Sequence, residues 1–162
     1  DYKISLGKKY IALNQLEFRI NLKVIGSWDG LSKERLEKCN AHIQLECIEY
    51  VPKKKLNSIM MSSHISLFLL PEVESAKGHV PGKLFDYMGA GNPILGLGPI
   101  SGDASEIIRS VKAGEVFSYE NTQGIVDFIK SHKENCPHLD PILTQNYERS
   151  LQAKAVVKAV FE

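Results

Sequence analysis

A lysine and an aspartate stand three residues apart at the expected start of a helix in the middle of the chain. Residues 80–102 are V-P-G-K-L-F-D-Y-M-G-A-G-N-P-I-L-G-L-G-P-I-S-G. Pro81 suits a first helical turn, and Gly82 lets a ligand approach the backbone. Free amide N–H groups and the Lys83 ammonium favour an anion there, and the carboxylate of Asp86, one turn deeper, can bind the two hydroxyls of a ribose. The pattern predicts a nucleotide site; the alternative is a surface ion pair between Lys83 and Asp86.

A polar loop over residues 72–79 comes just before this helix and adds further candidates. Either Glu72 or Glu74 can hold sugar hydroxyls or a positive charge that develops at an anomeric carbon. Lys77 and Gly78 can reach the phosphates of the same ligand. The alternative for all four is an exposed loop with solvated charges, and the sequence leaves this choice open.

Two further segments bear on the site. The backbone of Tyr50 and Val51 can read the edge of a base without a particular side chain, because backbone groups both donate and accept hydrogen bonds. The run Lys53-Lys54-Lys55 is interpreted first as a solvated face and second as a patch for a membrane surface. No strand is followed by the dinucleotide fingerprint G-x-G-x-x-G or by a P-loop, so Gly96 and Gly98 indicate packing and turn chemistry.

Strands that alternate with helices must position these residues. The pattern predicts an α/β fold with a Rossmann-like parallel sheet and helices on both faces, in a single domain over residues 1–162. The run at 65–70 is typical of a strand buried on both sides. Asp103 or Ser101 is expected to cap the helix at 104–111. Expected strands are 1–5, 22–25, 43–48, 65–70, 94–97 and 115–118; expected helices are 10–18, 32–39, 53–62, the central helix from Pro81 to Gly89 or Gly91, 104–111, 122–133 and 141–161, the last broken near Asn146.

The composition narrows the class of protein. The chain has 162 residues, 43% hydrophobic and 24% charged, as in an ordinary globular domain. Twenty basic and nineteen acidic residues nearly balance, so the chain has no strong positive field that would attract nucleic acid. Three cysteines indicate reduced thiols and a cytoplasmic protein, and the five histidines lack the spacing of a metal site. We expect no signal peptide and no membrane span.

The segment 80–95 resembles the P-x-K-x-x-E-Y-x-A-x-G-x-P-(V/I) segment of glycosyltransferase family 4, the retaining group-1 transferases of GT-B fold. The resemblance covers nearly the whole chain and implies that it is the C-terminal, donor-binding half of a GT-B fold. It implies that Asp86 takes the place of the glutamate that binds the donor ribose. Glu74 becomes the candidate for the catalytic glutamate that contacts the transferred sugar. The sequence departs from the family here, because eleven residues separate Glu74 from Asp86 and the second acid is Asp.

A second departure concerns the start of the chain. The family has a strand, a glycine-rich turn, and an Arg and a Lys that bind pyrophosphate. Here residues 1–4 run almost directly into Gly7-Lys8-Lys9, which leaves Lys8 as the candidate for that lysine. We expect further residues in the true polypeptide near Ile4 to Leu6, and an intact mass that matches these 162 residues would contradict this.

The resemblance implies a glycosyltransferase that moves a sugar from a nucleoside-diphosphate sugar to a glycan or lipid-linked acceptor, as in polysaccharide biosynthesis. No metal cofactor is expected. The acceptor domain would precede Asp1, so the isolated domain should bind nucleotide weakly and catalyse nothing. The expected location is the cytoplasm, with peripheral association at the inner face of the membrane as the second interpretation of the lysine run. Two alternatives stay open: a nucleotide-sugar epimerase of GT-B shape, with His79 as its only acid–base candidate, and a non-catalytic nucleotide-binding or interaction domain.

Overall fold

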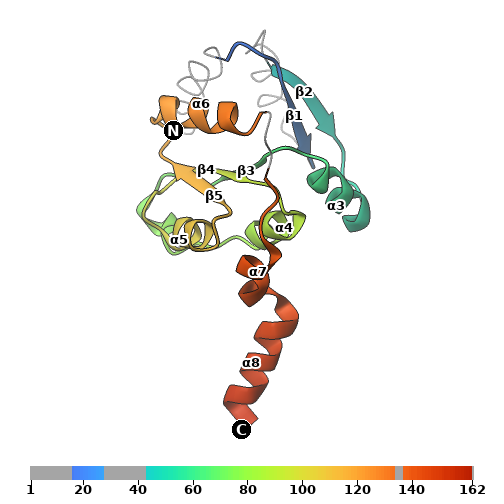
Figure 1. The fold of residues 1–162 in the computed structure, drawn as a ribbon, viewed down its shortest axis with the longest axis vertical. Coiled ribbons are helices and arrows are strands. Elements are labelled where there is room, and N and C mark those ends of the chain that lie inside the picture. The colour runs from blue at the N-terminus through green and yellow to red at the C-terminus, as the bar shows by residue number, and fades with distance from the viewer. Residues whose placement is uncertain (1–15, 28–42, 134–136, 162) are drawn as a thin grey trace.

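The computed structural model describes residues 16–27, 43–133 and 137–161, and the statements below concern these residues (Figure 1). The strands and helices follow one another along the chain as parallel strands and their connecting helices do. In chain order they are β1 (Ile20–Ile25), β2 (Ile43–Ile48), α3 (Lys53–Met61), β3 (Ser66–Leu69), the 3₁₀ helix η1 (Glu74–Ala76), α4 (Lys83–Ala90), β4 (Ile94–Leu97), α5 (Asp103–Ser110), β5 (Gly114–Phe117), α6 (Thr122–Ser131), α7 (Pro141–Thr144), the 3₁₀ helix η2 (Gln145–Tyr147) and α8 (Arg149–Phe161).

All strand pairs are parallel, which confirms the α/β, Rossmann-like fold class. The strands β1 and β2 pair with Ile20 opposite Ile43, and β4 lies between β3 and β5 in a second sheet. The described strands therefore form two parallel sheets, where one sheet was predicted. An alternation of strands and helices indicates parallel strands, but it does not specify which strands pair, because pairing joins residues far apart in the sequence.

The three-stranded sheet is covered on both faces (Figure 1). Phe68, Ile94 and Val116 face the helices α4 and α5, while Leu95 and Leu97 face α6. Each residue of β4 is buried, as a central strand between two helical layers requires. The core of the molecule therefore lies around β4. On the α4 and α5 side it includes Leu84, Met88, Ala104 and Ile108, and on the α6 side it includes Tyr119 and Ile125.

Burial on both sides was predicted for the strand at 65–70, and the structure shows it only in part. Phe68 is fully buried, but the side chain of Leu69 on the other face is 41% exposed. The reason is that β3 is an edge strand of its sheet and α6 covers mainly the other strands. The two-stranded sheet likewise leaves one face open, where Lys23 and its register partner Glu46 form an ion pair of 3.5 Å.

The helix α5 begins differently from the prediction. Its N-cap is Gly102 in extended conformation, and neither Asp103 nor Ser101 caps it with a side chain. Instead the backbone N–H of Asp103 donates to the carbonyl oxygen of Lys77 at 2.8 Å. A Cβ at Gly102 would lie 2.8 Å from the same oxygen. A carbonyl from a distant loop thus satisfies the helix start, which leaves no room for a larger cap residue.

The other boundaries lie close to the prediction. Gly91 ends α4 in the left-handed conformation, with φ of 79°. The C-terminal helix is broken near Asn146 as predicted, because Glu148 is extended between η2 and α8. The strand predicted at 1–5 and the helix at 32–39 lie outside the described residues. So does most of the helix at 10–18, whose last residues, 16–18, are not helical.

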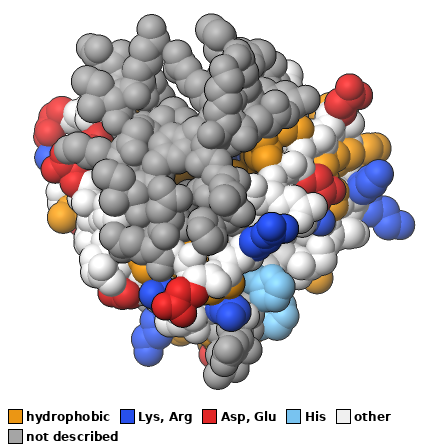
Figure 2. Space-filling view, turned by 90° about the horizontal axis from the view of Figure 1, so that it is seen from above, with side chains coloured by type: hydrophobic (Ala, Val, Ile, Leu, Met, Phe, Trp, Pro, Cys, Tyr) orange, Lys and Arg blue, Asp and Glu red, His pale blue; other side chains and the backbone are white. Residues whose placement is uncertain are grey.

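The described surface carries charges of both signs. Figure 2 shows acidic and basic side chains interspersed on the face that is seen from above. Among the described helices, none has the length and the hydropathy that crossing a bilayer requires. The interspersed charges indicate no large electrostatic field of one sign on this face.

Gly114 tests the close packing of β4 against β5. A Cβ at Gly114, where φ is 151°, would lie 2.0 Å from the carbonyl oxygen of Ile94. We expect Gly114→Ala to lower the free energy of unfolding by about 3 kcal/mol or more, because it combines backbone strain with overpacking.

The matched control is Gly89→Ala in the exposed face of α4, where a Cβ meets nothing within 4 Å. This change should raise the free energy of unfolding by about 0.5–1 kcal/mol, since alanine is the better helix former. Urea denaturation of both variants measures the difference, and equal effects would contradict the packing described here.

Candidate functional site

The start of α4 presents free backbone donors. The N–H of Leu84 donates to the carbonyl of Pro81 at 2.9 Å, and that of Phe85 to the carbonyl of Gly82 at 3.2 Å. Within the described residues, the N–H groups of Gly82 and Lys83 have no acceptor. Gly82 is exposed, and a Cβ there would meet nothing within 4 Å. This helix start is therefore open to a ligand and favours an anion.

Lys83 extends toward the end of β3. Its Nζ lies 5.2 Å from the centre of the Phe68 ring and donates to the carbonyl oxygen of Leu69 at 3.5 Å. Within the described residues it forms no ion pair with a carboxylate. Burial of the ammonium lowers the pKa of Lys83 from its ordinary value of 10.5. The result is a partly desolvated cation that lacks an anionic partner.

Asp86 pairs with a different lysine from the one considered in the sequence. Its Oδ1 lies 2.6 Å from the Nζ of Lys53, and its side chain is 39% exposed. The surface pair with Lys83 is absent, and the carboxylate faces solvent beside α3 instead of the core. Next to it, the pKa of Tyr87 is raised, first by burial and second by the negative charge of Asp86. Asp86 thus remains accessible to a polar ligand.

Lys53 brings a second predicted part of the site close to Asp86. It is the first residue of α3, and Tyr50 and Val51 precede it by three and two residues. The lysine run is exposed, as its first interpretation as a solvated face predicts, and Lys53 in addition pairs with Asp86. Tyr50 is 87% exposed and Val51 is partly buried. The backbone that was proposed to read a base therefore leads into the helix whose first residue pairs with the carboxylate that was proposed to bind a ribose.

A buried amide holds the other end of α3. The Nδ2 of Asn92, which is 1% exposed, donates to the carbonyl oxygen of Met60 in the last turn of the helix. Its Oδ1 is buried without a hydrogen-bond partner. Because the helix is tied at both ends to the segment after β3, its position relative to Asp86 is fixed. Asn92 has no signal in the sequence, since its partner lies thirty-two residues away.

The loop before α4 holds Glu74 at the surface. Glu74 begins η1, is 85% exposed, and pairs through Oε1 with the Nζ of Lys77 at 2.9 Å. The loop backbone is anchored, because the carbonyl of Lys77 accepts from the start of α5 and Ala76 is buried. Gly78 is exposed with open space around it. The loop thus has an anchored backbone and carries the Glu74–Lys77 ion pair at its surface.

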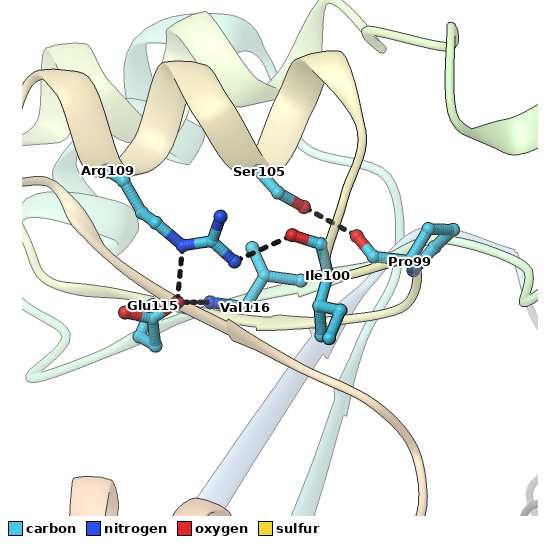
Figure 3. A network of polar contacts seen from close by, with 6 residues as sticks. All are labelled: Pro99, Ile100, Ser105, Arg109, Glu115 and Val116. Carbon is cyan, nitrogen blue, oxygen red and sulfur yellow. Dashed lines mark hydrogen bonds and ion pairs between the residues drawn. The ribbon is translucent and has the colours of Figure 1, made fainter.

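A polar network fixes the loop that follows β4 (Figure 3). The Oγ of Ser105 donates to the carbonyl oxygen of Pro99 at 2.6 Å, and the Nη2 of Arg109 donates to that of Ile100 at 2.7 Å. The Nε of Arg109 donates to the Oε1 of Glu115 at 2.8 Å. Two carbonyls at the carboxyl end of the central strand are therefore held by α5. The sequence carries no local signal of this network, because its members come from three separate elements.

The structure brings some of the predicted residues together and leaves others apart. Gly82, Lys83 and Asp86 share the start of α4, and Asp86 pairs with Lys53, which follows Tyr50 and Val51 along the chain. Among the described residues, no hydrogen bond or ion pair joins Glu74 or Lys77 to Gly82, Lys83 or Asp86, and Lys8 lies outside the described part. In that part, no group of three or more His, Cys, Asp or Glu side chains is placed to hold a metal ion.

The desolvated ammonium of Lys83 makes a prediction about pH. Because its pKa is lowered in the folded protein, the unfolded chain binds the proton more tightly. The free energy of unfolding should therefore rise as the pH increases through the lowered pKa toward 10.5. We expect Lys83→Met to be at least as stable as the wild type near neutral pH and to lose this rise. Urea denaturation from neutral pH to pH 10.5 measures it.

Lys54→Met is the matched control, since Lys54 is an exposed lysine in the first turn of α3. It should keep the dependence of the wild type. Identical curves for all three proteins would contradict the desolvation of Lys83.

Comparison with known proteins gives a structural neighbour and no sequence relative. No family model matches the chain, and no curated protein matches it by sequence. Among solved structures, the chain is similar to AviGT4, a glycosyltransferase involved in avilamycin A biosynthesis, with a TM-score of 0.63 and 18% identity. The match covers 96% of this chain and 46% of AviGT4, so the chain spans about half the length of that protein. At this identity the likeness shows the fold: parallel sheets flanked by helices, as in a glycosyltransferase.

Proposed function

We propose that this chain is the donor-binding domain of a retaining glycosyltransferase of GT-B shape and binds a nucleoside-diphosphate sugar. The observation that carries the proposal is the start of α4. Within the described part of the chain, it combines free N–H groups, an ammonium without a carboxylate partner and a carboxylate one turn later. The similarity of the fold to AviGT4 supports it. So does the resemblance of the segment 80–95 to family 4.

In this proposal the diphosphate lies at the N–H groups of Gly82 and Lys83. As the bond between the anomeric carbon and the phosphate oxygen breaks, its electron pair leaves with the diphosphate. The Lys83 ammonium and the helix dipole stabilise that charge, and a diphosphate beside Lys83 offsets the cost of its desolvation. Lys77 and Gly78 form the far side of the phosphate site. No metal is required in this scheme, because fixed positive groups do the same work.

The rest of the donor follows from the position of the diphosphate. The ribose hydroxyls donate to the Oδ2 of Asp86, while its Oδ1 keeps the contact with the Nζ of Lys53. The base lies against the backbone of Tyr50 and Val51. Glu74, at the surface of the loop, is proposed as the catalytic group that contacts the transferred sugar, and it must exchange its pair with Lys77 for the sugar hydroxyls.

The acceptor is a glycan or lipid-linked sugar, bound by a domain that this chain does not contain. This part of the proposal rests on the resemblance to family 4 and on the share of AviGT4 that the match spans. We place the enzyme in the cytoplasm, where the exposed lysines of α3 allow contact with an anionic membrane surface.

Calorimetry with uridine and guanosine diphosphates tests the site. The wild-type chain should bind one of them, and Asp86→Ala should weaken that binding by about tenfold or more, because a charged acceptor contributes roughly 1.5–3 kcal/mol. Lys83→Met should weaken it similarly through the loss of phosphate charge.

The control is Asp127→Ala in α6, whose carboxylate accepts from Gln123 on the same exposed helix face. It should bind as the wild type does. Equal binding by the wild type and Asp86→Ala, or no binding of either nucleotide, would contradict the proposed site.

The transfer reaction is tested separately, in a polypeptide that joins this chain to a domain encoded upstream. We expect transfer from a nucleoside-diphosphate sugar, and a loss of at least about a hundredfold in kcat for Glu74→Gln with nucleotide affinity unchanged. An upstream reading frame without such a domain would refute the transferase and leave a nucleotide-binding protein.

A further inference from the structure

A hollow of about 250 Å³ lies at the opposite end of the sheet from the candidate site. Pro93, which precedes β4, and Gly114, which begins β5, place it at the amino ends of these strands. Ala113, Leu139 and Leu143 add apolar surface. Its charged or ionisable lining groups are Lys112, His132, His138 and Asp140. None of them takes part in the function proposed above.

Both histidines place Nδ1 next to a backbone carbonyl. The Nδ1 of His132 lies 2.8 Å from the carbonyl oxygen of Phe128 and 3.0 Å from the Oγ of Ser131, and its ring stacks on the Phe128 ring at 4.2 Å between centres. The Nδ1 of His138 lies 3.2 Å from the carbonyl oxygen of Gly91. A carbonyl only accepts, so each Nδ1 carries the proton and donates. Each Nε2 has no partner within the described part of the chain.

Lys112 is the third group. Its φ is 52°, and it is the single residue other than glycine with positive φ in the described part of the chain. This conformation turns the chain between α5 and β5, and the Lys112 side chain has no ion-pair partner among the described residues. Asp140 is the N-cap of α7, where its Oδ1 accepts from the N–H of Ile142 at 2.9 Å.

We propose that this hollow binds a small organic phosphomonoester. When the two imidazoles are protonated, Lys112 and the two Nε2–H groups supply donors from three side chains, which match the three terminal oxygens of a phosphoryl group. The hydrogen bonds from Nδ1 to carbonyls hold the rings in place. The apolar surface of Leu139 and Leu143 accommodates a short apolar group next to the phosphate. The volume limits the ligand to a small molecule.

Phenyl phosphate is the probe for an NMR titration of the histidine Cε1–H signals, assigned with His132→Gln and His138→Gln. We expect saturable shifts of His132 and His138 and none of His64 or His79, which are exposed elsewhere. Bound phenyl phosphate should also raise the pH at which these two imidazoles protonate, with Lys112 and Asp140 as the other charged groups that line the hollow. Equal shifts of all histidines, or no saturable shift, would overturn the proposal.

Lys112→Gly separates binding from folding. Glycine adopts positive φ without strain, so this variant should unfold at a higher urea concentration than the wild type. It should nevertheless bind phenyl phosphate about tenfold more weakly, since it lacks one charged donor. Unchanged affinity would overturn the proposal.

Two further ligands define the chemical class. Inorganic phosphate should bind more weakly than phenyl phosphate, because it lacks the apolar group; equal affinity would refute an organic ligand. Zinc chloride should leave both signals in place under conditions where phenyl phosphate saturates. A saturable shift with zinc and none with phenyl phosphate would replace the phosphomonoester by a metal ion.

Discussion

The burial of β4 between two helical layers is the constraint on which the rest of the structure depends. The strand has no exposed residue, and its neighbours approach so closely that a Cβ at Gly96 would lie 2.6 Å from the Cγ2 of Val116. Since the strand cannot shift, both of its ends are fixed. The loop after its carboxyl end is further held by Ser105 and Arg109 (Figure 3). Rigid ends are what a binding site on a parallel sheet requires, because ligands lie in the loops there.

The charges near the start of α4 are divided unevenly, and this division suits an anionic ligand. Asp86 forms an ion pair with Lys53 from another helix, whereas Lys83 has a carbonyl and an aromatic ring as its neighbours. A lysine that is partly desolvated without a carboxylate costs free energy in the empty protein. A bound diphosphate would offset that cost, so the ligand and the fold favour the same arrangement of charge.

The parallel sheet also gives its two ends different roles. The carboxyl ends of the strands carry the candidate nucleotide site, while the amino ends of β4 and β5 border the hollow with two histidines and a lysine. The two sites therefore use different side chains and can be tested independently.

The sequence by itself determined the local features of this protein. Pro81 and Gly82 predicted the start of α4 and Gly91 its end, because a turn or a cap depends on neighbouring residues. The alternation of strands and helices predicted the fold class, and the Lys83 and Asp86 spacing placed both on one helix. Each of these signals involves residues that lie close together in the chain and is therefore visible in the sequence.

Only the tertiary structure decided which partners these residues have. Asp86 pairs with Lys53, the start of α5 uses the carbonyl of Lys77, and Asn92 holds α3. The same holds for the division of the strands into two sheets and for the hollow beside His132. Each of these contacts joins residues that lie far apart in the chain, and the local periodicity of a sequence carries no information about which distant segments meet.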